Sequence, residues 1–205
     1  MLEVRELECV RGDHRLFAGL SFSLQPGELL HLRGSNGSGK TSLLRTLCGL
    51  MAPASGEVLW QGENIHKLRE EYYSCLTYLG HSGAIKGDLS AWENLSISCH
   101  MTGLDIPQPR ITNALTEMGL GHRAELPTRV LSAGQKRRVA LARLLVSDAT
   151  IWVLDEPFTA LDVKAVALLK RLITQHLQAR GMVILTTHQD VDLDPGQMKE
   201  INLDS

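Results

Sequence analysis

One stretch decides the fold of this chain: Gly34-Ser35-Asn36-Gly37-Ser38-Gly39-Lys40-Thr41. It follows a short apolar run, Leu29–Leu32, and opens a helical pattern that runs to Leu50. Glycine at three positions lets the main chain turn so tightly that successive N–H groups point at one anion. A helix that begins at Lys40 brings the positive end of its dipole to the same place. The stretch therefore predicts a phosphate-binding loop between a strand and a helix.

The side chains of this loop predict its ligand. We expect all eight residues to bind a nucleoside triphosphate, with the Lys40 ammonium reaching the β- and γ-phosphates. The Thr41 hydroxyl is expected to coordinate Mg²⁺. The predicted ligands are therefore a nucleoside triphosphate and Mg²⁺. The alternative is a glycine-rich turn that binds nothing, but the strand before the loop and the helix after it favour phosphate binding.

The size, charge and cysteines of the chain exclude several classes of protein. Its 205 residues suffice for one domain with a core of its own. A net charge of −2 and a pI near 6.4 argue against nucleic acid as a partner, because binding to a phosphate backbone needs a basic face. The four cysteines are scattered, as expected of reduced thiols in a cytosolic protein. The N-terminal segment is acidic, so no secretory signal is expected. The chain has no long apolar run, so no membrane-spanning helix is expected either.

Apolar patterning predicts an α/β core of two kinds of strand. Alternation near Leu2–Val10 and Leu20–Leu24 indicates an antiparallel portion at the N-terminal end. Unbroken apolar runs at Ile151–Leu154 and Met182–Leu185 indicate buried, parallel strands, joined by a helix over Val163–Gln178. Further strands are expected at Glu57–Trp60 and Leu76–Leu79.

The apolar residues in the middle of the chain follow a helical pattern instead of a strand pattern. Helical periodicity at Ala91–Met101 and Ile111–Met118 predicts a small helical subdomain over about residues 82–150. Residues 1–81 and 151–205 would then form the core, so that 1–205 make a single domain with a mixed or parallel sheet flanked by helices.

Two acidic residues, Asp155 and Glu156, follow the Ile151–Leu154 strand directly. Ligands of parallel α/β sheets gather at the carboxyl ends of the strands, where these carboxylates would lie. Asp155 is suited to hold Mg²⁺ through water, and Glu156 to polarise the water that attacks a γ-phosphate. Alone the pair also fits a solvated strand end, but beside a phosphate loop it predicts a hydrolytic site.

A third segment, Leu131-Ser132-Ala133-Gly134-Gln135, is a good helix start, with Ser132 and Gln135 spaced as a capping box. With the motifs above it carries a family resemblance. Leu131–Gln135 resembles the signature motif of ATP-binding cassette (ABC) ATPases, with Ala133 where glycine is usual. Thr159–Asp162 resembles the D-loop of that family, and Thr187-His188 resembles its switch histidine. The chain is thereby identified as having a P-loop NTPase core of the ABC ATPase type.

The resemblance implies how the parts work together. Two copies are expected to close head to tail around two ATP molecules, each nucleotide lying between the Gly34–Thr41 loop of one copy and Ser132, Gly134 and Gln135 of the other. The resemblance also implies that His188 contacts the γ-phosphate and helps to set the attacking water. Asp162 is expected to communicate across this dimer.

Two positions depart from the family pattern. His81, after Gly80, stands where most members have glutamine, and a neutral imidazole offers one donor and one acceptor in a different geometry. It is still expected to contact the γ-phosphate or the water on Mg²⁺. The usual adenine-stacking aromatic residue is missing, which leaves two candidates, Arg11 and Phe17.

Several runs, among them Tyr78–His81 and Leu89–Leu95, resemble the ATPase subunits of bacterial cytochrome c maturation. The resemblance implies an ATPase on the cytoplasmic face of the bacterial inner membrane, held peripherally by integral membrane subunits. We expect these subunits to meet it around His81–Leu89 and the helical insert. Hydrolysis would drive either haem export or release of haem-loaded chaperone. The same motor serving another cargo, or soluble cofactor assembly, is the alternative.

Two tempting binding motifs are not expected to bind. Cys99-His100-Met101 offers ligand types for haem iron, but adjacent positions on a helix point in different directions. The basic residues after the capping box are expected to form salt bridges or to lie near phosphate, not to bind nucleic acid: Lys136, Arg137, Arg138 and Arg143.

Overall fold

The computed structural model describes residues 1–81, 83–101, 103, 106–188 and 198–204. It contains two compact units, each described here by itself. The first unit comprises Met1–Tyr78, Ala149–Glu156 and Ile173–Ser205, and the second comprises Leu79–Asp148 and Pro157–Leu172. Ser82, where the helical subdomain is predicted to begin, lies outside the described residues.

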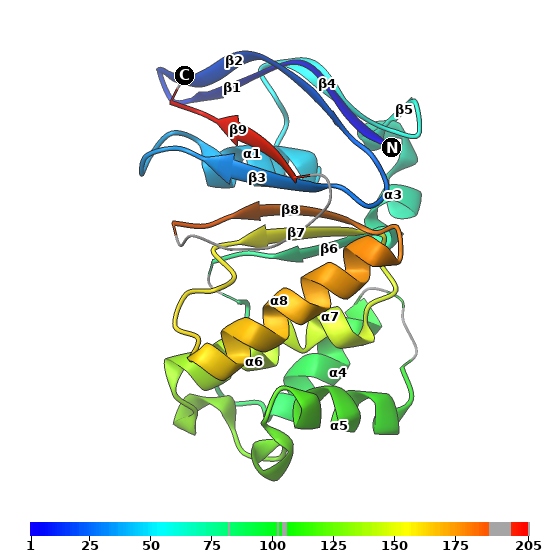
Figure 1. Ribbon diagram of the computed structural model, residues 1–205, viewed down its shortest axis with the longest axis vertical. Helices are drawn as coiled ribbons and strands as arrows, with labels where there is room; N and C mark the ends of the chain where they lie inside the picture. The colour runs from blue at the N-terminus through cyan, green and yellow to red at the C-terminus, as the bar shows by residue number, and fades with distance from the viewer. Residues whose placement is uncertain (82, 102, 104–105, 189–197, 205) are drawn as a thin grey trace. The chain divides into compact units, whose positions relative to one another are not determined.

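The first unit holds a four-stranded antiparallel sheet in the order β2-β1-β4-β5 (Figure 1). Its strands are β1 (Leu2–Arg11), β2 (His14–Leu24), β4 (Ser55–Trp60) and β5 (Glu63–Asn64). The alternation of β1 breaks between Val4 and Leu7, because the left-handed backbone of Glu6 forms a bulge that faces Gly56. The predicted antiparallel portion is confirmed, but β2 is longer than predicted.

A five-stranded sheet has the order β6-β7-β8-β3-β9. Its strands are β6 (Leu76–Leu79), β7 (Ile151–Asp155), β8 (Met182–Thr186), β3 (Leu29–Arg33) and β9 (Met198–Asn202). Parallel pairing joins β7 to β8, β8 to β3, and β3 to β9. Every residue of β7 and β8 is buried, which confirms the reading of their apolar runs. Strand β9 was not predicted.

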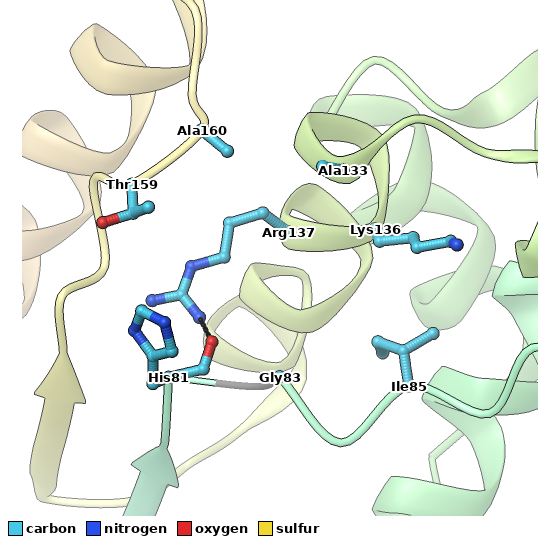
Figure 2. Close-up of a pocket in the computed structure, with 8 residues that line it drawn as sticks. All are labelled: His81, Gly83, Ile85, Ala133, Lys136, Arg137, Thr159 and Ala160. Atoms are coloured by element: carbon cyan, nitrogen blue, oxygen red, sulfur yellow. Dashed lines mark hydrogen bonds between the residues drawn. The ribbon is translucent and has the colours of Figure 1, made fainter.

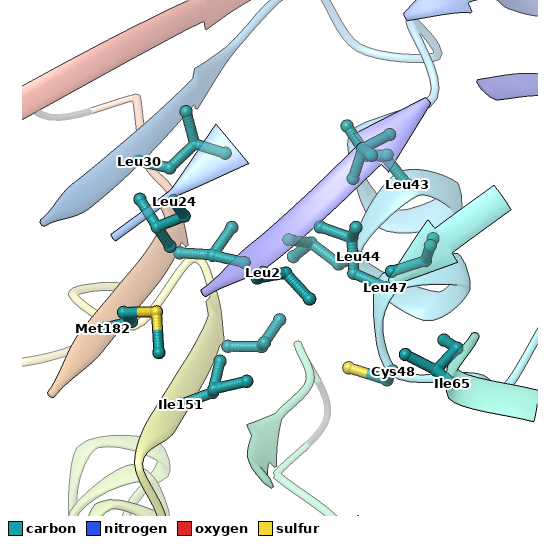
Figure 3. Packing of buried hydrophobic residues seen from close by; sticks show 14 of the residues in the cluster. Leu2, Leu24, Leu30, Leu43, Leu44, Leu47, Cys48, Ile65, Ile151 and Met182 are labelled. Carbon is teal, nitrogen blue, oxygen red and sulfur yellow. The ribbon is translucent and has the colours of Figure 1, made fainter. Parts of the chain in front are cut away.

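The core of the first unit fixes the helix that follows the phosphate loop. Helix α1 (Lys40–Leu47) turns Leu43, Leu44 and Leu47 inward, each fully buried among residues of β1, β3, β7 and β8 (Figure 3). A buried leucine contributes about 2 kcal/mol, so three of them fix where the helix begins. The helix ends three residues before the predicted Leu50, because Gly49 adopts a left-handed φ of 68°.

Two short helices, α2 (Ile65–Leu68) and α3 (Glu70–Ser74), complete this unit together with the C-terminal part of α8 (Val163–Gln178).

The second unit is helical. Its helices are α4 (Ala91–Met101), α5 (Gln108–Glu117), α6 (Ala133–Leu141), α7 (Arg143–Val146) and the first part of α8, with 3₁₀ turns at Gly121–Arg123 and Thr128–Val130. Helix α4 matches its predicted bounds, whereas α5 begins earlier, with Pro109 in its first turn. In the part of the chain that is described, no helix is long and apolar enough to cross a membrane.

Candidate functional site

The predicted phosphate loop lies between β3 and α1. Gly34, Gly37 and Gly39 have φ values of 145°, 92° and 103°, which residues with a side chain rarely adopt. The loop is closed by a hydrogen bond from the Ser38 N–H to the Ser35 carbonyl, at 3.3 Å, and Leu43 donates to Gly39 in the first turn of the helix. The sequence thus gives a loop shaped for an anion at the N-terminus of a buried helix.

The Lys40 ammonium folds back over this loop. Its Nζ donates to the main-chain oxygens of Gly34, at 2.6 Å, and Ser35, at 2.8 Å. Bonds from an ammonium to phosphate oxygens are charge-assisted and stronger than bonds to neutral carbonyls. A bound phosphate can therefore replace both carbonyls as the partner of Lys40.

The carboxyl end of β7 meets the start of α1. Asp155 is 3% exposed, and its Oδ2 accepts a hydrogen bond from the Thr41 hydroxyl at 3.0 Å. Its Oδ1 accepts from the Thr186 hydroxyl at 2.8 Å. The same hydroxyl accepts from the Glu156 N–H at 3.0 Å. Thr186, at the end of β8, therefore fixes both acids, a role that sequence reasoning missed.

Glu156 and His188 lie together at the edge of the sheet. His188 Nε2 is 3.5 Å from Glu156 Oε1, and the imidazole is more than half exposed. Glu156 has a φ of 50°, a strained conformation for a residue with a side chain. The structure therefore brings Thr41, Asp155, Glu156 and His188 to one edge of the sheet.

The oxygen atoms at this edge fit Mg²⁺. The Thr41 hydroxyl and the Asp155 carboxylate are the hard ligands that this ion prefers, usually with water and phosphate completing its shell. Burial, and after it the neighbouring Asp155 carboxylate, raises the pKa of Tyr78.

Of the two candidates for stacking on adenine, Phe17 contacts the phosphate loop. A Cβ on Gly39 would lie 3.2 Å from Phe17 Cδ1, so the half-buried ring packs on the last glycine of the loop. Arg11, at the end of β1, is exposed.

In the second unit, the capping box is confirmed at the start of α6. The Gln135 N–H donates to Ser132 Oγ at 3.2 Å, and the Ser132 N–H donates to Gln135 Oε1 at 3.0 Å. Ser132 remains exposed. A Cβ on Gly134 would lie 2.6 Å from the Ala160 carbonyl, so only glycine allows the segment before α8 to approach this closely.

Asp162 holds the same region together. Its Oδ2 accepts from Arg138 Nη2 at 3.0 Å, and its Oδ1 accepts from the Ala165 N–H at 2.9 Å at the start of α8. Arg138 is thus engaged in an ion pair, as the sequence predicted for this basic segment.

Beside the start of α6 lies a pocket of about 270 Å³ (Figure 2). It is lined by His81, Gly83, Ile85, Ala133, Lys136, Arg137, Thr159 and Ala160. The Arg137 guanidinium extends from α6 and donates to the carbonyls of Gly80 at 3.1 Å, His81 at 3.4 Å and Pro157 at 3.3 Å. Arg137 is 8% exposed, and sequence reasoning did not foresee that it binds these main-chain segments.

The ABC transporter family model matches residues 17–159, which include the phosphate loop, the acid pair and the capped helix. The chain belongs to the ABC transporter family. As an ABC ATPase it binds and hydrolyses ATP. The protein of Nitrosomonas europaea named "Cytochrome c biogenesis ATP-binding export protein CcmA" is 57% identical over 191 residues, which are 93% of this chain and 90% of that protein.

Solved ABC structures agree with the fold. A putative ABC transporter ATP-binding protein from Pyrococcus furiosus superposes with a TM-score of 0.82 at 26% identity, covering 97% of this chain and 96% of the other. An ATP-binding cassette solved as a dimer in a post-hydrolysis state with ADP and Pi superposes with a TM-score of 0.79, covering 92% and 88%. At 23% identity, the second likeness bears on the fold alone.

The residues of the Cys99-His100-Met101 run in this ABC ATPase lie in different surroundings. Cys99 is buried, Met101 is 82% exposed, and His100 Nδ1 lies 2.8 Å from the Ser96 carbonyl of its own helix. That these residues do not bind haem stays a prediction.

Proposed function

We propose that this ABC ATPase is the motor subunit of a membrane complex for c-type cytochrome maturation, coupling ATP hydrolysis to haem export or to release of haem-loaded chaperone. The observation that carries the proposal is the 57% identity, over nearly the whole of both chains, with a protein named for cytochrome c biogenesis. It would act on the cytoplasmic face of the bacterial inner membrane.

We assign the chemistry to the first unit. Mg²⁺, held by Thr41 and by Asp155 through water, would supply positive charge to the phosphates when bound. Lys40 leaves the carbonyls of Gly34 and Ser35 and binds phosphate oxygens, while the loop N–H groups bind the others.

Glu156 would orient the attacking water and act as a general base that accepts a proton from it. His188, 3.5 Å from that carboxylate, would orient the same water and contact the γ-phosphate.

The capped start of α6 suits a second phosphate contact. Ser132 is exposed at a helix N-terminus whose dipole is positive, and Gly134 and Gln135 follow it in the first turn. We propose that these residues contact the nucleotide of a second copy in a head-to-tail dimer. Asp162, held by its ion pair with Arg138, would communicate with the second copy across that dimer.

We place the membrane subunits on the loop before α4. The buried Asn94 holds the last part of this loop: it binds the main chain of Lys86 in both directions, at 2.8 and 3.0 Å, and also the carbonyls of Leu89 and Ser90. A largely apolar pocket of about 310 Å³ lies between the loop and the exposed Met101. A largely apolar pocket that Lys86 and Arg143 also line fits a short helical segment of a membrane protein.

Charge reversal tests this surface. Lys86→Glu should weaken co-purification with the membrane subunit and leave ATP binding at the wild-type level, because Lys86 is exposed and distant in sequence from every phosphate-loop residue. Co-purification equal to that of the wild type would overturn the assignment.

The overall proposal is tested in the native cell with Glu156→Gln in place of the wild type. Covalent haem in periplasmic c-type cytochromes and haem held on the maturation chaperone are both quantified. Loss of cytochromes with haem stranded on the chaperone places hydrolysis at the release step, and loss of both places it at export. Normal cytochromes would refute the haem assignment. Glu125→Gln, an exposed glutamate of the second unit, is the matched control.

A further inference from the structure

A carboxylate from the far end of the sequence holds the first half of the phosphate loop. Asp204 accepts hydrogen bonds from the Ser35 N–H at 2.7 and 3.0 Å, through its two oxygens. Its Oδ1 also accepts from the Ser35 hydroxyl at 2.8 Å. The two residues are separated by 169 positions in the sequence. Asp204 therefore binds both the main-chain N–H and the side-chain hydroxyl of Ser35.

The parallel pairing of β3 with β9 explains how Asp204 reaches the loop. The pair runs in register to Arg33 and Asn202, and the Leu203 N–H extends it by donating to the Arg33 carbonyl at 3.0 Å. Parallel strands end at the same edge of a sheet, so the chain after each strand arrives at the same place. One residue further on, the ladder is continued by the side chain of Asp204.

The same serine is held from the opposite side. The Ser35 carbonyl accepts from Lys40 Nζ at 2.8 Å and from the Ser38 N–H. When Lys40 exchanges its bond to Ser35 for a bond to phosphate, the Ser35 carbonyl keeps its bond from the Ser38 N–H at 3.3 Å. Asp204 still holds the N–H and the hydroxyl of Ser35 through three bonds of 2.7 to 3.0 Å, so it contributes most of the contacts that remain.

We infer that Asp204 is a positioning residue for nucleotide binding: it fixes Ser35 so that the loop keeps its phosphate-binding shape when Lys40 moves to the nucleotide. The inference rests on the proposed binding of ATP by Gly34–Thr41. It differs from a simple charge effect, because a carboxylate beside a triphosphate would by itself weaken binding.

Three variants separate shape from charge. Asp204→Ala removes every bond to Ser35, whereas Asp204→Asn keeps one oxygen that can accept from the N–H and the hydroxyl but carries no charge. Ser35→Pro removes the N–H and the hydroxyl that Asp204 binds. Asp148→Ala, which removes an exposed aspartate paired with Arg110 in the second unit, is the matched control.

The measurement is the equilibrium Kd of the purified full chain for a fluorescent ATP analogue with Mg²⁺, with the thermal unfolding midpoint of each variant. Both groups are exposed and water competes for them, so we expect Asp204→Ala to raise the Kd roughly three- to fivefold. Asp204→Asn should stay within about twofold of the wild type, since it keeps the oxygen that accepts from Ser35. In the Ser35→Pro background, Asp204→Ala should cause no further loss.

Three results would overturn the inference. The first is an Asp204→Ala variant whose unfolding midpoint falls while its Kd stays at the wild-type value, since that marks a merely structural contact. The second is tighter binding by both Asp204 variants, which marks repulsion of the phosphates. The third is an undiminished effect in the Ser35→Pro background. Failure of the wild type itself to bind the nucleotide would instead refute the proposed role of the loop.

Discussion

Replacing Thr186 by valine removes one hydroxyl and almost no volume. That hydroxyl is fully buried, donates to Asp155 Oδ1 at 2.8 Å and accepts from the Glu156 N–H at 3.0 Å. Valine leaves the Asp155 carboxylate, which is 3% exposed, with one hydrogen-bond donor fewer. The Glu156 N–H retains a second partner, the Thr186 carbonyl at 3.2 Å.

The cost follows from these contacts. A hydrogen bond to a buried charged group is worth about 1.5–3 kcal/mol, and the Glu156 N–H adds little because it keeps a partner. We therefore expect Thr186→Val to lower the free energy of unfolding by about 2–3 kcal/mol. For a chain of this size, that is a fall of roughly 4–12 °C in Tm. A less firmly held Asp155 should also raise the Mg²⁺ concentration needed for half-maximal ATPase activity.

Thermal unfolding and a Mg²⁺ titration of ATPase activity check both effects. Thr186→Ser is the matched control, because it keeps the hydroxyl and loses one methyl group, at about 1 kcal/mol. The reasoning is refuted if Thr186→Val is as stable as the wild type, or if Thr186→Ser is the more damaging of the two.

Three further changes test other parts of the chain. Phe17→Ala should raise the KM for ATP at least about fivefold by removing a stacking surface, and Arg11→Ala should not; the opposite ranking would favour Arg11. Gly56→Ala should lower the free energy of unfolding by more than about 2 kcal/mol, because the φ of Gly56 is 80° and an added Cβ would meet the carbonyls of Arg5 and Glu6. In the same denaturant titration Gly62→Ala should cost about half as much, because Gly62 has a φ of 90° but open space around it. Burial lowers the pKa of His176, so below about pH 6.5 the unfolded chain binds the proton better than the folded chain, and stability falls as the pH falls. Between pH 7 and pH 5 the Tm of His176→Gln should therefore fall less steeply than that of the wild type. Equal slopes for the two proteins would contradict this.

The sequence predicted the parts of the fold whose signals are local. Strands β7 and β8 are unbroken apolar runs because both faces of each are buried. The capping box of α6 depends on residues three positions apart, so it can be read directly from Ser132 and Gln135. By contrast, β9 alternates exposed and half-buried residues and carries Lys199 and Glu200, so nothing in its composition marks it as a strand.

What could not be predicted depends on contacts between distant segments. Asp204 meets Ser35 only because β9 adds to β3, and Thr186 meets Asp155 only because β8 lies beside β7. Arg137 appears in the sequence as one of several basic residues, and only the fold turns it inward to main-chain carbonyls. The motifs predict which groups contact the nucleotide, whereas the residues that hold those groups are defined by topology.

The left-handed backbone of Glu156 sets folding against activity at a single position. A residue with a side chain loses about 1–2 kcal/mol in this conformation, and glycine would not. Glycine, however, has no carboxylate to offer to water. Backbone strain alone therefore favours glycine at this position, whereas the proposed catalytic role of Glu156 requires the carboxylate. Any search for more stable variants of this protein will meet the same conflict: Glu156→Gly should raise the free energy of unfolding and, on the proposed role of Glu156, abolish ATP hydrolysis.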